Sequence, residues 1–295
     1  MRTTLAPRIK DSKEGTRETR VRKRTTESTA ELIEKEHEGD RQFVTALHRG
    51  LEILRAFKPD DASGLGNREL AERTGLPNST VSRLTYTLLK LGYLVYDDGT
   101  GRYRMGVPVL GLGYACLGGL RIRETVQPHM QRVADECGDG VLVALGGRDD
   151  MKMSYIAAAR ASAGMISLQL NVGSRISLAR SAMGRAYIAG TDEHERAQIM
   201  QRVEERTDPA DWPELRDGIE DAASQIKERG FYVSIGKWQT DVHAVSVPYR
   251  SMHGDTPMLA FNLGGPGYML PRERLENELG PKLVQMRNTI ARVSG

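Results

Sequence analysis

The chain has 295 residues, of which 39% are apolar and 5% aromatic, and its length favours two domains over one. No stretch approaches roughly 18 consecutive apolar residues, which excludes a membrane-spanning helix, and the charged N-terminus lacks the apolar core of a secretory signal. Two cysteines, Cys116 and Cys137, are too few for a disulfide framework, and a net charge of +3 excludes a polycation, so we expect a cytoplasmic protein with no membrane partner.

Charge divides the first 40 residues into two parts. Residues 1–24 carry nine basic and three acidic side chains, whereas residues 25–40 carry one lysine and six acids. Apolar side chains are too few to offset the entropy of ordering, so residues 1–40 are predicted to form a disordered or partly helical extension, with a candidate helix at 26–37. The basic part suits nonspecific contact with DNA phosphates, although a solvated tail has the same composition.

Residues 41–106 are predicted to form a first domain. Apolar side chains recur every three or four positions from residue 43, which predicts a helix of about 15 residues whose apolar stripe faces the core. The stripe consists of Val44, Leu47, Leu51, Leu54 and Phe57.

The rest of this domain follows a recognisable order. Asn67 is predicted to cap a short helix that ends at Gly75, and a second helix runs over 78–91 to Gly92. Strand-like residues 93–96 and 102–105 flank a turn at 97–101. Helix, glycine turn, helix and hairpin in this order are typical of a winged helix-turn-helix domain.

The outward face of the second helix suits DNA. Small hydroxyl side chains near its start leave room for close approach, and the fork of Arg83 fits the O6 and N7 acceptors of guanine. Basic side chains on the hairpin suit the phosphate backbone or the minor groove. A merely solvated helix and hairpin is the alternative. The predicted DNA-binding residues are Ser79, Thr80, Ser82, Arg83, Tyr86, Arg102 and Arg104.

Residues 107–121 are rich in small and apolar side chains and are predicted to form a linker helix, with 110–120 as a candidate contact between subunits. A helix at 121–137 opens a second domain, residues 122–295, in which strands and helices form an α+β structure. Strands are predicted at 141–145, 153–157, 165–170, 175–178, 231–235, 244–248 and 258–263, and helices at 181–189, 192–201, 213–229 and 272–291.

Sequence signatures of enzymes and metal sites do not occur. The six histidines are scattered, and the motifs of zinc peptidases, CxxC sites and GxSxG hydrolases do not occur, so we expect no cofactor, no metal and no catalysis. Glycines 264, 265 and 267 are predicted to form a turn after the last strand. The helix start at 181–186 is a candidate anion site, because its free amides bind carboxylates and Arg180 lies beside it; an ordinary capped helix is the alternative.

Motifs throughout residues 43–294 resemble those of the IclR-type transcriptional regulators. At the front, the similarity lies in residues 46–54 (ALHRGLEIL), 69–84 (ELAERTGLPNSTVSRL), 91–93 (LGY) and 100–106 (TGRYRMG). At the back it lies in residues 172–175 (VGSR), 181–186 (SAMGRA), 228–231 (ERGF) and 244–248 (AVSVP).

This resemblance implies a winged helix-turn-helix domain, a linker helix and a GAF-like effector-binding domain with an antiparallel sheet. It also implies a homodimer or homotetramer that binds a double-stranded DNA operator of a catabolic operon, as repressor or activator, in response to a small organic or aromatic acid. An enzyme or stand-alone sensor with a vestigial DNA-binding domain is the alternative.

The resemblance also implies the effector site. The ligand of the family lies against the helix-start amides, here of Ala182 and Met183. An acidic position of the family falls on Ser234, a cysteine on Ala244, and two serines on Asn262 and Gly264. Loss of the acid favours an anion with more apolar bulk than glyoxylate or pyruvate. The predicted effector-binding residues are Arg180, Ser181, Ala182, Met183, Ser234, Ala244, Asn262 and Gly264.

Overall fold

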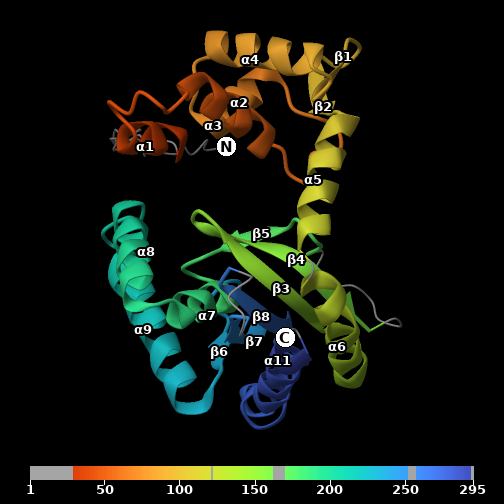
Figure 1. Cartoon of the computed structure of the whole chain (residues 1–295), viewed down its shortest axis with the longest axis vertical. Coiled ribbons are helices and arrows are strands. Elements are labelled where there is room, and N and C mark those ends of the chain that lie inside the picture. The colour runs from red at the N-terminus through yellow and green to blue at the C-terminus, as the bar shows by residue number, and fades with distance from the viewer. Residues whose placement is uncertain (1–28, 121, 162–169, 252–256, 294–295) are drawn as a thin grey trace, which may run out of the picture. The chain divides into compact units, whose positions relative to one another are not determined.

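The computed structural model describes residues 29–120, 122–161, 170–251 and 257–293, and the chain divides into two units, residues 1–108 and 109–295 (Figure 1). The first unit has four helices and one hairpin among its described residues. The helices are α1 (Thr29–Glu36), α2 (Thr45–Arg55), α3 (Asn67–Thr74) and α4 (Asn78–Lys90), and the strands are β1 (Leu94–Asp97) and β2 (Arg102–Met105).

Glycines end two of these helices, as the sequence predicts. Gly75 follows α3 with a φ of +74°, and Gly92 follows α4 with a φ of +77°, a backbone region that other residues rarely adopt. The two strands pair antiparallel from Leu94–Met105 to Asp97–Arg102, and together they form the predicted wing.

Only part of the apolar stripe predicted along α2 contacts the core of this unit. Leu54 and Phe57 pack against the core, and Ile53 is fully buried. Val44, Leu47 and Leu51 are 59%, 62% and 50% exposed, because periodicity alone does not say how much of an apolar stripe the same chain covers. The core residues are Ile53, Leu65, Leu70, Leu76, Val81 and Leu94.

The predicted cap of α3 is also wrong by one residue. Gly66 precedes the helix, and its N–H donates to the carboxylate of Glu69 at 2.9 Å. Asn67 is the first helical residue, and its amide donates to the hydroxyl of Ser82 on α4. The carboxylate of Glu69, three positions after Gly66, therefore accepts the free N–H at this helix start.

The second unit is built around one six-stranded antiparallel sheet, in the order β5-β4-β3-β8-β7-β6. Two helices precede it, α5 (Val107–Gly119) and α6 (Ile122–Cys137). The strands are β3 (Leu142–Asp149), β4 (Lys152–Arg160), β5 (Arg175–Ser177), β6 (Tyr232–Ile235), β7 (Val242–Tyr249) and β8 (Leu259–Pro266).

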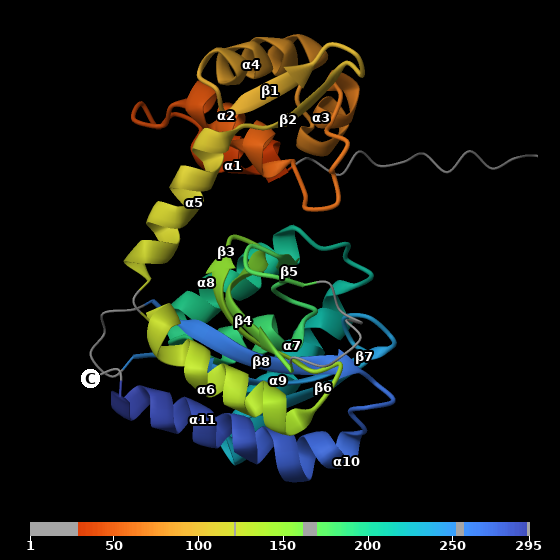
Figure 2. The same cartoon turned by 90° about the vertical axis from the view of Figure 1, so that its right-hand side faces the viewer.

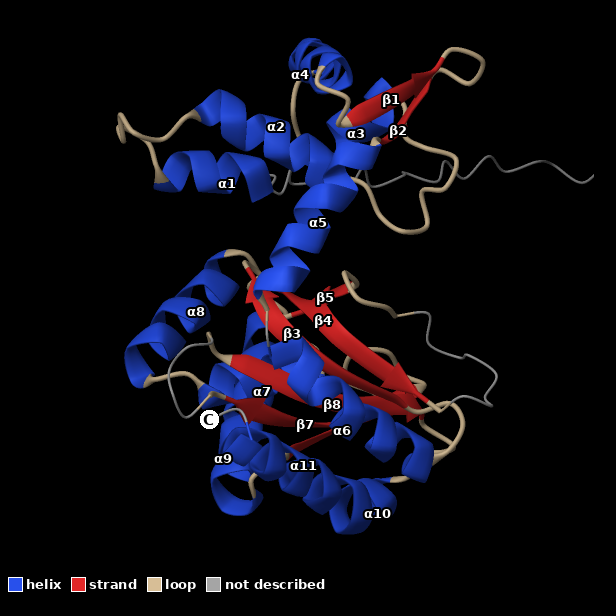
Figure 3. Cartoon of the chain, turned by 45° about the vertical axis from the view of Figure 1, so that its right-hand side comes forward, coloured by secondary structure: helices blue, strands red, loops and turns tan. Residues whose placement is uncertain are grey.

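Helices cover both faces of this sheet, as two further views show (Figures 2 and 3). One face packs against α6, α10 (Arg272–Arg274), a π-helical turn (Leu275–Leu279) and α11 (Gly280–Val293). The opposite face packs against α7 (Ala182–Gly190), α8 (Glu193–Glu205) and α9 (Trp212–Arg229).

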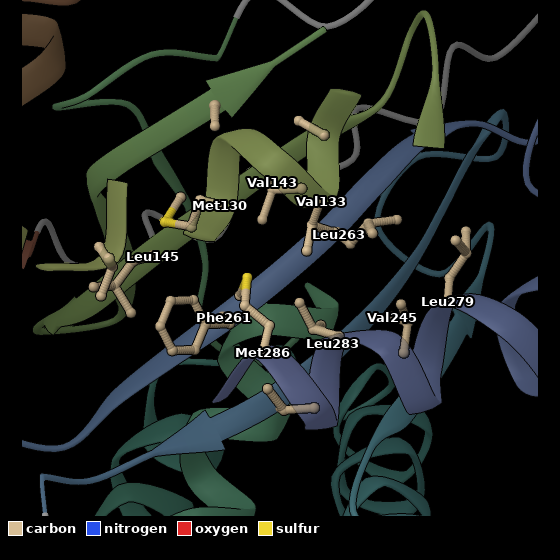
Figure 4. Close-up of a cluster of buried hydrophobic side chains, with 14 of the residues drawn as sticks. Met130, Val133, Val143, Leu145, Val245, Phe261, Leu263, Leu279, Leu283 and Met286 are labelled. Atoms are coloured by element: carbon tan, nitrogen blue, oxygen red, sulfur yellow. The ribbon is translucent and has the colours of Figure 1, made fainter. Parts of the chain in front are cut away.

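The core on the α6 and α11 side is the larger of the two (Figure 4). Alternate residues of β3, β7 and β8 point into it, as the period of a strand requires. The residues labelled in the figure are Met130, Val133, Val143, Leu145, Val245, Phe261, Leu263, Leu279, Leu283 and Met286. The other residues of the same strands face α7, and that face holds the site described below.

Two expectations for this unit change, and a third is not tested. Residues 165–169 of the predicted strand 165–170 lie outside the described residues. Gly264 and Gly265 are part of β8 rather than of a turn, because both keep their ladder partners on β7. The predicted helix 272–291 contains the π-helical turn, after which Gly280 packs directly against the ring of Phe231.

Candidate functional site

The outward face of α4 presents polar side chains that have few internal partners. Arg83 is exposed, and its side chain makes no hydrogen bond or ion pair with another described residue, while its carbonyl accepts from the hydroxyl of Thr87. Tyr86 is 60% exposed, and Nζ of Lys90 lies 5.3 Å from the centre of its ring. Ser79 is exposed, Thr80 is half-buried, and the hydroxyl of Ser82 is already engaged by the carbonyl of Asn78 at 3.0 Å.

The two arginines of the wing differ in their surroundings. Nε of Arg102 donates to the carbonyl of Gly64 at 3.0 Å, and its Nη2 donates to the carboxylate of Glu69 at 2.8 Å. The N–H of Gly66 and Arg102 together hold the pKa of Glu69 below its ordinary value. Arg104 is more exposed, with only a 3.4 Å contact to Asp97. Arg102 therefore ties the wing to α3, and Arg104 is the freer cation.

A pocket opens in the second unit between the start of α7 and the sheet. The space between its walls is about 400 Å³ when the open solvent at the mouth is included, and the cavity itself is about 20 Å³, which is room for about one water molecule. Six of the eight predicted effector residues line it: Ser181, Ala182, Ser234, Ala244, Asn262 and Gly264. The six other lining residues are Leu142, Tyr155, Leu170, Ile176, Trp238 and Val242.

Sheet register brings the distant lining residues together. Ser234 on β6 pairs with Ala244 on β7, and Ala244 pairs with Gly264 on β8. Gly264 in turn pairs with Leu142 on β3. These four residues form one row across the sheet, on the face that α7 covers. We refer to them as the pocket row.

The start of α7 faces the same pocket. The hydroxyl of Ser181 accepts the N–H of Gly184 at 3.0 Å, as a capping residue does. The amides of Ala182 and Met183 are the first two of the helix and have no acceptor within it. The side chain of Met183 packs against Gly146 on β3, and Met183, although predicted as an effector residue, does not line the pocket.

Arg180 does not line the pocket. Its Nη2 donates to the carboxylate of Asp211 at 2.6 Å, and its side chain is 42% exposed. Asp211 lies 31 positions further along the chain, so the local sequence around Arg180 did not reveal this partner.

Sequence reasoning missed the aromatic walls. Tyr155 alternates with other inward residues of β4, and that alternation was the available signal; Trp238 lies in the turn after β6 and carried none. Burial raises the pKa of Tyr155, so its hydroxyl stays neutral. Aromatic side chains of this kind favour contact with a flat apolar group.

Sequence reasoning also missed a buried cation, Arg185, which lies one turn after Ala182 on α7. Its side chain donates to the carbonyl of Ala179 at 2.9 Å and to the hydroxyl of Tyr232 at 2.8 Å. Among the described residues no carboxylate lies within ion-pair distance of it. A Cβ at Gly218 on α9 would overlap the guanidinium. An uncompensated positive charge beneath the helix start favours an anion nearby.

Two other kinds of site receive no support from the described parts of the chain. Histidine, cysteine and carboxylate side chains form no group of three that would hold a metal ion there. None of the helices in those parts is both long and apolar enough to cross a membrane.

The chain resembles known protein families over both of its units. The model of the IclR helix-turn-helix domain matches residues 46–98, and the model of the bacterial transcriptional regulator IclR C-terminal matches residues 114–292. The HTH-type transcriptional regulator TsaQ1/TsaQ2 of Comamonas testosteroni is 33% identical, over 83% of this chain and 86% of its own length.

Solved structures agree with this result. An IclR family transcriptional regulator from Brucella abortus is 42% identical, with a TM-score of 0.76 over 88% of this chain and 96% of that chain. An IclR homolog from Microbacterium hydrocarbonoxydans, solved in complex with 4-hydroxybenzoate, is 20% identical, with a TM-score of 0.59 over 83% of this chain and 95% of that chain. The second likeness concerns the fold alone.

Proposed function

This chain belongs to the IclR family of DNA-binding transcriptional regulators, and from that premise we propose that a small aromatic or other organic acid, bound in the pocket, controls its binding to the operator of a catabolic operon. In this proposal residues 41–106 bind DNA, residues 107–121 link the domains and residues 122–295 bind the effector. The relatives are regulators rather than enzymes.

One observation carries the effector class: the pocket lies at the start of α7, where the first amides have no acceptor within the helix, and its lining residues include no carboxylate. Its polar groups are the amides of α7, the hydroxyls of Ser181, Ser234 and Tyr155, and the amide of Asn262. Donors placed at one end of an otherwise apolar cavity favour a carboxylate with a hydrophobic body. The Microbacterium homolog that was solved with 4-hydroxybenzoate supports the aromatic members of this class.

On the DNA side, Arg83 reads a base and the wing positions the domain. A free guanidinium on the exposed face of α4 suits bidentate contact with guanine, and Arg104 suits a phosphate. In this proposal Arg102 holds the wing in place, and contact with a DNA phosphate is its alternative role. The remaining predicted contacts are Ser79, Thr80, Ser82 and Tyr86.

The described surface supports assembly into a homodimer or homotetramer. Helix α5 has no charged residue, and on it Val107, Leu110, Leu112 and Tyr114 are all more than half exposed. Apolar area of this extent, together with the exposed stripe of α2, is typical of a subunit interface. A two-fold dimer then reads half-sites about 34 Å apart, one turn of DNA.

The testing experiment combines a ligand screen with gel shifts. Thermal unfolding of the full chain is followed with aromatic and short-chain acids, and a binder at a hundredfold excess over its Kd stabilises by roughly 2.7 kcal/mol. The acid that stabilises most is then added to gel shifts on DNA from around the gene. Stabilisation without any change in specific DNA binding would contradict the proposal.

A further inference from the structure

A second row of buried residues lies next to the pocket row, and two of its members, Ser246 and Asn262, are joined by a side-chain hydrogen bond. The hydroxyl of Ser246 on β7 lies 2.6 Å from Oδ1 of Asn262 on β8, and the two residues are register partners. Ser246 is completely buried and does not line the pocket, whereas Asn262 does. Ser246 therefore contacts the ligand site only through Asn262.

This hydrogen bond sets the direction of the Asn262 amide. With Oδ1 accepting from the serine hydroxyl, the two N–H donors of Nδ2 point away from Ser246. Nδ2 lies beside Gly264 of the pocket row, since a Cβ at Gly264 would be 3.3 Å from it and 3.3 Å from Cβ of Ala244. Nδ2 makes no hydrogen bond with another described residue. The result is a fixed pair of donors in a nearly buried wall.

A fixed, unpaired donor constrains the ligand. Asn262 is 7% exposed, so water has little access to its amide once the pocket is filled. A ligand that presents a methyl group there leaves the donors unpaired, which costs affinity, and a ligand that presents an N–H group opposes donor with donor. A hydrogen-bond acceptor on the ligand satisfies the amide, and the lining residues contain no carboxylate that would take its place.

We infer that the effector is an acid that presents a second hydrogen-bond acceptor to the amide of Asn262, and that Ser246 is the positioning residue that imposes this requirement. The inference rests on the proposed function, because it takes the pocket to bind an acid. It adds that discrimination comes from the polarity of the second group, and that a side chain outside the pocket decides that polarity.

The test is titration calorimetry on the full chain with matched benzoates that carry a carboxylate, acetyl, methyl or amino group at the 3- or 4-position, alongside aliphatic dicarboxylates and monocarboxylates of equal length. The acceptor-bearing acids are expected to bind roughly 10- to 100-fold more tightly than their methyl counterparts if the second group is charged, and less if it is neutral. Ser246→Ala is expected to reduce this ratio to within about 3-fold, because the amide is then free to turn.

Two variants separate positioning from folding. Ser246→Thr keeps the hydroxyl and is expected to keep the preference for acceptors. Asn262→Asp replaces the donors by an acceptor, so the amino-substituted acids are expected to become the better ligands relative to the dicarboxylates. Both proteins are checked for unchanged thermal unfolding without ligand.

The outcomes are distinguishable. Equal binding of acceptor and methyl compounds, or a preference that survives Ser246→Ala, would overturn the inference and leave the acid pocket intact. Failure of every acid to bind would overturn both the inference and the proposed effector class. Operator binding in a gel shift is measured in parallel, because it tests the DNA-binding half of the function independently.

Discussion

Nη2 of Arg102 on the wing lies 2.8 Å from both carboxylate oxygens of Glu69, which is in the first turn of α3. The same carboxylate accepts the N–H of Gly66, so one acidic side chain caps a helix and anchors the wing. The ion pair is partly exposed, so it adds little to the free energy of folding and acts mainly by fixing the position of the wing.

The role of Arg102 follows from comparing two variants. If it anchors the wing, Arg102→Ala and Glu69→Gln weaken operator binding by similar amounts, and the double variant is little worse than either. If it contacts phosphate instead, only Arg102→Ala lowers the slope of log K against log salt, by about 0.9. Gel shifts from 50 to 200 mM salt distinguish the two roles.

Replacing Arg83 and replacing Arg104 by alanine are expected to have different effects on DNA binding. Arg83→Ala should lose roughly 1–3 kcal/mol of discrimination at one base pair, since a bidentate contact with guanine is removed. Arg104→Ala should weaken all sequences alike and lower the salt slope by about one ion. Competition gel shifts with singly substituted operators measure both effects. An unchanged operator preference in Arg83→Ala would mean that α4 is not the reading helix in the register assigned.

The pocket is expected to close when its row gains one methyl group. Gly264→Ala places a Cβ 3.3 Å from Cβ of Ala244 and 3.3 Å from Nδ2 of Asn262, at the pocket wall. Ala182→Leu fills the opposite side. Affinity for the acid should fall at least 10-fold in both variants, whereas operator binding without ligand should not change. Calorimetry and gel shifts on the same samples check this, with Tyr268→Ala, which is 86% exposed, as the control.

Subunit association should depend on the exposed apolar faces. Leu110→Glu on α5 and Leu51→Glu on α2 put a charge into the proposed interface, and both should shift the protein towards a 32.7 kDa species in light scattering. Tyr268→Glu places the same charge on another exposed apolar side chain and should have no effect. Equal behaviour of all three variants would place the interface elsewhere.

The first unit should lose folding stability as the pH is lowered, because two of its carboxylates have lowered pKa values. Hydrogen bonds from Arg73 hold the pKa of Asp61 below its ordinary 3.8, and the Gly66 N–H and Arg102 hold that of Glu69 below 4.5. A lowered pKa stabilises the fold above the ordinary value, and this stabilisation is lost as the pH falls through the folded one.

Both tryptophans, Trp212 and Trp238, belong to the second unit, so their fluorescence cannot follow the first unit. Amide hydrogen exchange should therefore show residues 45–105 losing protection below about pH 4.5, and Asp61→Asn should flatten this dependence. Hydrogen-exchange protection that stays constant down to pH 3 would show that the carboxylates of Asp61 and Glu69 do not stabilise the first unit.

Local signals predicted much of the fold. The glycines that end α3 and α4, the hairpin and most strands follow from turn chemistry and periodicity within a few residues. The side-chain partners did not follow, because Glu69 lies 33 positions before Arg102 and Asp211 lies 31 positions after Arg180. The exposure of Val44, Leu47 and Leu51 on α2 could not be predicted either, since an apolar stripe has the same pattern whether it faces its own core or another molecule.

Four of the lining effector residues, Ser234, Ala244, Asn262 and Gly264, came from the family resemblance rather than from spacing, and the register of β6, β7 and β8 explains why they meet. The aromatic walls, Tyr155 and Trp238, and the hidden partner Ser246 needed the three-dimensional structure. In each case the relevant neighbour is on a different strand or loop.

The pocket row has a consequence for how such a sensor changes over time. Its members are held by main-chain hydrogen bonds between strands, and those bonds are indifferent to the side chain that each position carries. Ser234, Ala244 and Gly264 can therefore be exchanged one at a time, and each exchange alters what is recognised without disturbing the frame that holds it. A lineage of such proteins can acquire new signals by single mutations while its DNA-reading half stays the same.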